Sequence, residues 1–124
     1  MLKINRTYFL FYYDDPDYRY EIAPADILIS KDVESLSWDG LSIKFILTPG
    51  HSKGGMCVSI GDMLFTGDTI MPFKPYFNGR DSNEDDWDAS ISKVESMFPE
   101  DTVIYPGHGE ILKLKDWKLQ YDIL

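Results

Sequence analysis

The chain has 124 residues, of which 44% are hydrophobic, and this composition is typical of one globular domain and excludes a disordered polypeptide. Its net charge of −9 argues against a nucleic-acid or anionic-membrane partner, because such partners require basic residues that neutralise phosphates. No apolar run is long enough for a membrane-spanning helix, and the first residues lack a signal-peptide core, so we expect a cytoplasmic protein.

The first 24 residues are the hardest to interpret. An aromatic run from Thr7 to Tyr13 favours β structure, and a proline among three aspartates ends it at residues 14–17. After this region the turn residues become regular, and we predict short strands at residues 26–29 and 33–37.

The clearest strand pattern covers residues 41–47, where apolar residues at period two share one face: Leu41, Ile43, Phe45 and Leu47. Ile46 is apolar as well, so we expect the opposite face to be partly covered near the end of this strand. Two further strands, at residues 56–60 and 63–65, are expected to form a hairpin around Gly61-Asp62.

The remainder is expected to contain one or two helices. After an irregular loop at residues 71–79, Ser82 or Asn83 can cap a helix that Pro99 ends. Its apolar positions recur at helical spacing and are Trp87, Ile91, Val94 and Phe98. A short strand is expected at residues 102–105, and the terminal residues fit a helix.

The single cysteine, Cys57, excludes an intrachain disulfide. It lies in an apolar, strand-like run, which favours a buried and unreactive thiol. A nucleophilic mechanism in which Ser52 or Cys57 acts with His51 has no supporting spacing and no third partner, so we give it little weight.

Three turns carry most of the functional information. Both histidines of the chain, His51 and His108, follow a Pro-Gly pair at the end of a strand, and Asp68 follows another strand in a Gly-Asp-Thr turn. Taken singly, each is explained as a turn residue that bonds nearby backbone. As a set, they predict a metal site, because imidazole and carboxylate groups carried on neighbouring strand ends can converge on one ion.

These segments resemble the metallo-β-lactamase superfamily, and within it the glyoxalase II-like hydrolases. The similarity covers residues 25–110 and includes Thr48-Pro49-Gly50-His51-Ser52, Leu64-Phe65-Thr66-Gly67-Asp68-Thr69 and Tyr105-Pro106-Gly107-His108-Gly109. The resemblance implies that His51 is a ligand of a first metal, His108 a ligand of a second, and Asp68 the carboxylate between them. It also implies a divalent metal, with zinc preferred over iron or manganese, and hydrolysis of acyl compounds such as thioesters.

The chain departs from the family pattern in one respect. The His-x-His-x-Asp-His motif that precedes these segments in the family is absent, since His51 is the first histidine. The resemblance therefore implies an α+β fold that is about the second half of the αββα sandwich, with a mainly antiparallel or mixed sheet. We expect a single domain, 1–124, with an N-terminal segment 1–24, a metallo-β-lactamase-like region 25–110 and a terminal segment 111–124.

Two functions are compatible with this pattern. The first is a truncated metal-dependent hydrolase for a small-molecule substrate, inactive or weakly active alone. The second is a metal-free, non-catalytic association domain that keeps the fold. In either case one sheet face lacks its usual cover, and the candidates are a second copy of the chain, a separately encoded N-terminal half, or the aromatic segment Tyr8–Tyr13.

Overall fold

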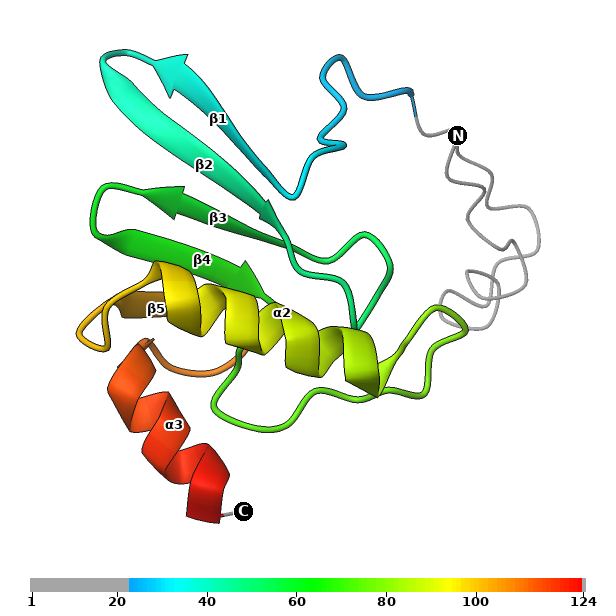
Figure 1. Ribbon diagram of the computed structural model, residues 1–124, viewed down its shortest axis with the longest axis vertical. Coiled ribbons are helices and arrows are strands. Elements are labelled where there is room, and N and C mark those ends of the chain that lie inside the picture. Colours follow the sequence, from blue (N-terminus) through cyan, green and yellow to red (C-terminus); the bar gives the residue numbers. More distant parts are fainter. Residues whose placement is uncertain (1–22, 124) are drawn as a thin grey trace.

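The computed structural model describes residues 23–123, which form one mixed sheet with two helices (Figure 1). The sheet has six strands in the order β1-β2-β3-β4-β5-β6, and only the pair β4–β5 is parallel. The strands are β1 (Val33–Trp38), β2 (Leu41–Leu47), β3 (Met56–Ile60), β4 (Met63–Gly67), β5 (Val103–Pro106) and β6 (Leu112–Lys113). The sequence therefore predicted the fold class correctly, and the aromatic run Thr7–Tyr13 lies outside the described residues.

The strands β1 to β4 form an antiparallel meander, in which short turns join β1 to β2 and β3 to β4 and a longer connection, residues 48–55, joins β2 to β3. Asp39 and Gly40 both have positive φ and form the turn that joins β1 to β2, and Gly61, also at positive φ, joins β3 to β4. The predicted strand at residues 26–29 is wrong. Residues 26–28 are exposed and Ile29 is half-buried, and none of them forms a strand, because within residues 23–123 β1 is the edge strand on that side of the sheet and pairs only with β2.

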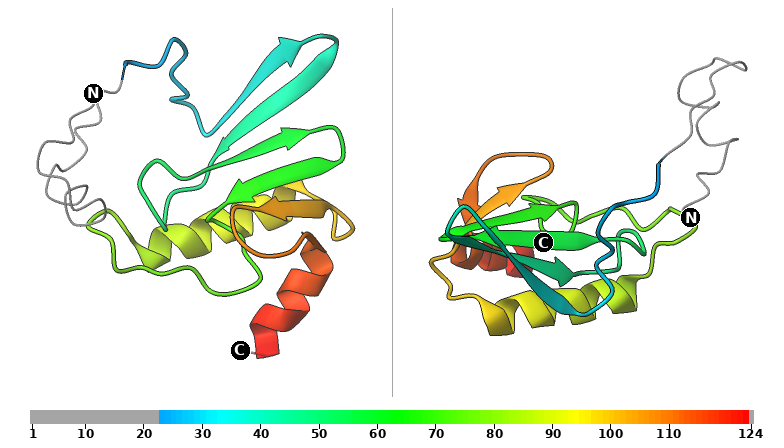
Figure 2. Two further views of the ribbon diagram at one scale, coloured as in Figure 1. Left: turned by 180° about the vertical axis from the view of Figure 1, so that it is seen from behind. Right: turned by 90° about the horizontal axis from the view of Figure 1, so that it is seen from above.

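The two helices are α2 (Glu84–Met97) and α3 (Leu114–Ile123), and both pack on the same face of the sheet (Figure 2). Asn83 is the N-cap of α2, since its side chain accepts a hydrogen bond from the backbone N–H of Asp86, and α2 ends before Pro99 as expected. The terminal segment is a helix from Leu114 onward. The two residues before this helix, Leu112 and Lys113, form β6 and pair with β5. No helix within residues 23–123 is long and apolar enough to span a bilayer.

The core lies between the sheet and the two helices. It contains one inward residue from each of β2 to β5, the loop residue Ile70, the apolar side of α2 and two residues of α3: Ile46, Cys57, Leu64, Ile104, Ile70, Trp87, Ile91, Val94, Leu114 and Trp117. The expected apolar spacing of the helix is thereby confirmed. Ile46 of β2 is fully buried, as expected for the covered face near the end of that strand.

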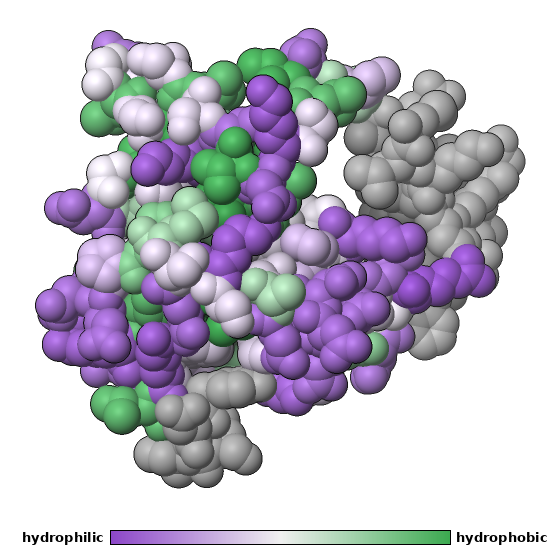
Figure 3. All heavy atoms as spheres, in the orientation of Figure 1, coloured by the Kyte–Doolittle hydropathy of each residue, from purple (hydrophilic) through white to green (hydrophobic). Residues whose placement is uncertain are grey.

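The opposite surface of the sheet has no cover from the described residues, and we call it the open face. Cross-strand pairing places on it the outward residues of β1 to β5, among them Leu36 and Trp38 of β1, Phe45 of β2, and Met63 and Phe65 of β4. The period-two row predicted for residues 41–47 does share one face, and that face is the open one. Figure 3 views the molecule from the side of the helices, and hydrophilic side chains gather there over α2.

Candidate metal centre

The three predicted ligands meet at one edge of the sheet. Strands β4 and β5 are parallel neighbours, so the turns that follow them, with Asp68 and His108, lie side by side. Strand β2 runs in the same direction as β4, because two antiparallel pairings separate them, and His51 follows β2 at the same edge. The sequence prediction that neighbouring strand ends bring these residues together agrees with this placement.

Each imidazole faces a different oxygen of the same carboxylate. The distance from His51 Nε2 to Asp68 Oδ2 is 3.4 Å, and the distance from His108 Nε2 to Asp68 Oδ1 is 3.3 Å. Asp68 therefore lies between the two histidines. The site is accessible from solvent, since 34% of the His51 side chain and 69% of the His108 side chain are exposed.

A backbone carbonyl fixes the orientation of His51. The distance from its Nδ1 to the carbonyl oxygen of Tyr76 is 2.8 Å, and because a carbonyl can only accept, Nδ1 carries the proton. In the neutral imidazole the free lone pair is then on Nε2, which faces Asp68. Tyr76 lies in the irregular loop predicted at residues 71–79, so this loop positions a candidate ligand.

Glycine allows the second and third turns to approach each other. A Cβ added at Gly107 would lie 2.8 Å from Asp68 Oδ1 and 3.0 Å from the backbone of Gly67, both closer than ordinary contact. The Gly107 N–H also donates to the Gly67 carbonyl at 2.8 Å. The turn after β5 can therefore lie against the Asp68 carboxylate only because residue 107 has no side chain.

The start of α2 holds the first turn in place. The hydroxyl of Ser90 donates to the Pro49 carbonyl at 2.7 Å, the hydroxyl of Ser82 donates to the His51 carbonyl at 2.8 Å, and the backbone N–H of Asn83 donates to the Gly50 carbonyl at 2.8 Å. Gly50 has φ of 147°, and a Cβ there would lie 2.4 Å from the Cβ of Trp87. The Pro-Gly-His turn is therefore bound to the helix by three hydrogen bonds and one close backbone contact.

A buried polar group connects the first two turns. The hydroxyls of Thr48 and Thr69 are 2.9 Å apart, and the indole Nε1 of Trp87 donates to the Thr69 carbonyl at 2.7 Å. Cys57 Sγ lies 3.5 Å from the Thr48 hydroxyl. Burial raises the pKa of the Cys57 thiol, more than the hydrogen bond from Thr48 lowers it, so the thiol is neutral and belongs to the core, as the sequence indicated.

The imidazole and carboxylate donors of the site, and the distances between them, fit a divalent metal ion. When two donor atoms bind the same tetrahedral ion at about 2.0–2.1 Å, they lie about 3.3–3.4 Å from each other. The pairs His51 Nε2–Asp68 Oδ2 and His108 Nε2–Asp68 Oδ1 have this spacing. Each pair, however, is one imidazole and one carboxylate oxygen, whereas a catalytic zinc has three protein donors. Within residues 23–123 no group of three or more such side chains forms a complete cluster for one ion.

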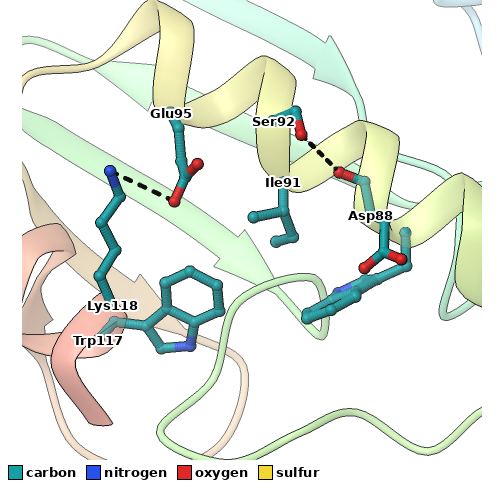
Figure 4. Close-up of a pocket in the computed structure, with 7 residues that line it drawn as sticks. Asp88, Ile91, Ser92, Glu95, Trp117 and Lys118 are labelled. Carbon is teal, nitrogen blue, oxygen red and sulfur yellow. Dashed lines mark hydrogen bonds and ion pairs between the residues drawn. The ribbon is translucent and has the colours of Figure 1, made fainter. Parts of the chain in front are cut away.

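Another hollow, of about 500 Å³, lies between α2 and α3 (Figure 4). Two of its charged groups pair with each other, since Lys118 Nζ lies 3.4 Å from a carboxylate oxygen of Glu95, and the hydroxyl of Ser92 donates to the backbone carbonyl of Asp88 in its own helix. None of the three candidate ligands lines it. The candidate functional site is therefore the sheet edge, where the three predicted ligands lie.

The sequence did not identify the residues that support the ligands. Tyr76 contributes only its backbone carbonyl, and every residue type has one, so the sequence could not indicate this contact. Ser82 was considered as a helix cap, but Asn83 is the cap and Ser82 bonds the His51 carbonyl. Ser90 lies four residues before Val94, on the buried side of α2. A polar residue among the apolar positions of a helix is the sequence feature that could have identified it.

Comparison with known proteins shows the family of the chain. Residues 3–108 match the family model of the metallo-beta-lactamase superfamily. The chain is 36% identical over 91 residues to the "Probable polyketide biosynthesis zinc-dependent hydrolase BaeB" of Bacillus velezensis, covering 73% of this chain and 40% of that protein. It is 30% identical over 110 residues to the "Atrochrysone carboxyl ACP thioesterase" of Aspergillus fumigatus (86% and 32%), and 33% identical over 79 residues to the "Hydroxyacylglutathione hydrolase" of Aeromonas hydrophila (62% and 30%).

Solved structures show the same fold. The ETHE1 protein of Myxococcus xanthus superposes with a TM-score of 0.68 at 22% identity, over 76% of this chain and 44% of that chain. The BLEG-1 B3 metallo-beta-lactamase superposes with a TM-score of 0.67 at 27% identity, over 75% and 46%. The chain thus spans less than half the length of these relatives. Three strand-end turns with the family's residues, the family-model match and the shared sheet lead to one conclusion: the chain belongs to the metallo-β-lactamase superfamily.

Proposed function

We propose that this chain is part of a cytoplasmic, divalent-metal-dependent hydrolase for small acyl substrates such as thioesters, and that it supplies some of the metal ligands. In this proposal His51 and His108 would each hold one ion, and Asp68, which lies between the two histidines, would contribute one carboxylate oxygen to each. The observation that carries the proposal is the position of the two Nε2 atoms, each against its own oxygen of Asp68 at the spacing of a shared tetrahedral ion.

The substrate class rests on the relatives. One curated relative is named a zinc-dependent hydrolase, another an ACP thioesterase and a third a hydroxyacylglutathione hydrolase. A divalent metal at such a site polarises an acyl carbonyl and activates water for its hydrolysis. In this chain, the loop whose Tyr76 carbonyl orients His51 also exposes the rings of Phe73 and Tyr76, which offer an apolar surface to an acyl chain.

The chain by itself is expected to have only weak hydrolase activity. Each ion receives two donors from the described residues, one fewer than a catalytic zinc requires from protein. We therefore expect loose metal binding and slow hydrolysis unless other donors complete the set. Zinc is the metal we propose, with iron or manganese as the alternatives.

Metal uptake by variants tests the proposal. The chain is dialysed against zinc and its content is measured by mass spectrometry of the bound metal, with affinity from calorimetry. Asp68→Asn is expected to remove most zinc, and His51→Ala or His108→Ala to weaken binding at least tenfold, because the three residues share one centre. Asp81→Asn is the control, since Asp81 is an exposed aspartate paired with Lys53. Zinc uptake that none of the three ligand variants changes would contradict the proposal.

One observation favours the second function, a metal-free association domain. The open face is apolar and uncovered by the described residues, which is typical of an interface. The two functions differ in the same assay: an association domain would take up no stoichiometric metal, and His51 and His108 would only bond Asp68 as turn residues.

A further inference from the structure

We propose that Trp87 is a positioning residue for the candidate metal centre, and that it acts on the His51 side of the centre and not on the His108 side. Its effect on metal binding rests on the proposed function. The indole N–H of Trp87 can only donate a hydrogen bond, so this side chain is not itself a metal ligand. It acts through the backbone segments that hold His51 next to Asp68.

Trp87 links the turn that carries His51 to the turn that carries Asp68. On one side, its backbone lies against the first turn, since a Cβ added at Gly50 would lie 2.4 Å from the Cβ and 2.5 Å from the Cα of Trp87. On the other side, its indole Nε1 donates to the backbone carbonyl of Thr69, the residue after Asp68, at 2.7 Å. One residue of α2 therefore sets the separation of these two turns.

The indole of Trp87 also supports the loop that orients His51. The ring of Phe77 meets the indole edge-on, with ring centroids 5.6 Å apart and an interplanar angle of 67°. The residue before it, Tyr76, provides the carbonyl oxygen that lies 2.8 Å from His51 Nδ1. A displaced indole would therefore also displace the carbonyl that fixes the imidazole ring.

The surroundings of the indole hold it in place. Trp87 is 1% exposed, and Trp117 packs edge-on against it with ring centroids 6.5 Å apart. A buried indole N–H needs an acceptor, so a shifted ring would lose its bond to the Thr69 carbonyl. A fixed side chain of this kind suits a positioning role, because ligands have to be held within about 0.5 Å of their productive geometry.

The His108 side of the centre has different supports. The Gly107 N–H donates to the Gly67 carbonyl at 2.8 Å, and a Cβ added at Gly107 would lie 2.8 Å from Asp68 Oδ1. Neither contact involves Trp87. A change at Trp87 should therefore alter how His51 lies relative to Asp68 and leave His108 in place.

Nitrogen NMR of the two imidazoles tests the proposal in EDTA, without metal or activity. The full chain is labelled with ¹⁵N-histidine, so that only His51 and His108 are observed, and His108→Ala assigns the two. The spectra are recorded at about pH 8.5, where a free imidazole is neutral. In the parent chain we expect His51 to carry its proton on Nδ1, because the Tyr76 carbonyl accepts from that atom.

Trp87→Phe keeps an aromatic ring and removes the N–H donor. We expect His51 to lose at least about half of its Nδ1–H form, since the other tautomer can donate from Nε2 to Asp68 or water, while the His108 signals stay unchanged. Val94→Ala is the control for general loosening of the core, because Val94 is fully buried on the same side of α2, and it should change neither imidazole.

Phe77→Leu is a second, milder variant. It keeps an apolar side chain in the loop and removes the ring that meets the indole of Trp87. We expect the His51 tautomer to change in the same direction as in Trp87→Phe, and by less.

Zinc titration of the same spectra connects this role to the proposed function. Each imidazole reports on the ion nearest to it. Trp87→Phe is expected to raise the zinc concentration that half-shifts the His51 signals by about tenfold or more. The corresponding concentration for His108 should stay within about twofold. A parent chain whose imidazoles do not respond to zinc would contradict the proposed function, and the metal-free tautomer would still decide the role of Trp87.

Three results would overturn the proposal. The first is an unchanged His51 tautomer in folded Trp87→Phe or, where that variant does not fold, in Phe77→Leu. The second is a change in Val94→Ala as large as the change in Trp87→Phe, which would show only a loosened core. The third is an equal change at His108, which would show that Trp87 does not act on one side of the centre.

Discussion

At the residue scale, the candidate centre depends on where side chains are absent as much as on where ligands are present. Gly107 has no Cβ and this allows its turn to lie against Asp68, and Gly50 likewise lies against the backbone of Trp87. The two histidines and the aspartate could be predicted from their turns. The close contacts could not, because they join turns that are distant in sequence.

Substitution of Gly107 tests this packing. Gly107→Ala places a methyl group 2.8 Å from Asp68 Oδ1, and we expect a loss of about 1–3 kcal/mol in the free energy of unfolding, together with weaker zinc uptake. Gly54→Ala is the matched control, because nothing lies within 4 Å of its added Cβ. That variant is expected to be neutral or stabilising by about 0.4–1 kcal/mol. Urea denaturation measures both, and equal effects would refute the packing argument.

Cys57 gives a pH-dependent prediction. Burial raises the pKa of its thiol, so the folded state keeps a proton that the unfolded state loses above about pH 8.5. The associated stability is complete below that pH and is lost as the pH rises through the folded-state pKa. The free energy of unfolding, measured in urea between pH 7 and 10, should therefore fall more steeply for the parent chain than for Cys57→Ala. Parallel curves would show that the thiol is not protected.

At the element scale, α2 has two tasks. Its apolar side covers the sheet, and Ser90 together with Ser82 and Asn83, the two residues before the helix, binds the Pro-Gly-His turn. Residue spacing predicted the first task. The second depends on the position of the helix relative to the turn after β2, which is a tertiary feature.

Two serines on α2 separate these tasks. Ser90 is buried and Pro49 half-buried, so Ser90→Ala leaves the Pro49 carbonyl without its donor where water has little access, and we expect a loss of about 1–3 kcal/mol in the free energy of unfolding. Ser92 is exposed and bonds only the Asp88 carbonyl of its own helix, so Ser92→Ala should be neutral or slightly stabilising. Thermal and urea unfolding compare the two variants, and a costly Ser92→Ala with a harmless Ser90→Ala would contradict this assignment.

At the scale of the whole molecule, the two faces of the sheet differ in what they contribute. The helix-covered face holds the buried core, whereas the open face is apolar but accessible. The stability of the chain alone should therefore come from one face.

Adjacent residues of β4 test this asymmetry. Leu64 is fully buried under the helices, and Leu64→Ala is expected to cost about 2–5 kcal/mol. Met63 is on the open face, and Met63→Ala is expected to cost less than about 1 kcal/mol in the isolated chain, because its side chain is partly solvated before unfolding. Urea denaturation of both variants measures the difference. Similar costs would mean that the open face is packed in solution.

The sequence by itself determined the elements and the ligand types. Turn glycines and period-two alternation located the strands from residue 33 onward, and Pro-Gly-His and Gly-Asp-Thr identified the candidate ligands. It failed at residues 26–29, where local β propensity had no neighbouring strand to pair with. Only the tertiary structure decided that His51 and His108 face opposite oxygens of Asp68, that α2 fixes the first turn, and which apolar face stays open. These features depend on contacts between distant segments, and local sequence patterns carry no information on how such segments pack.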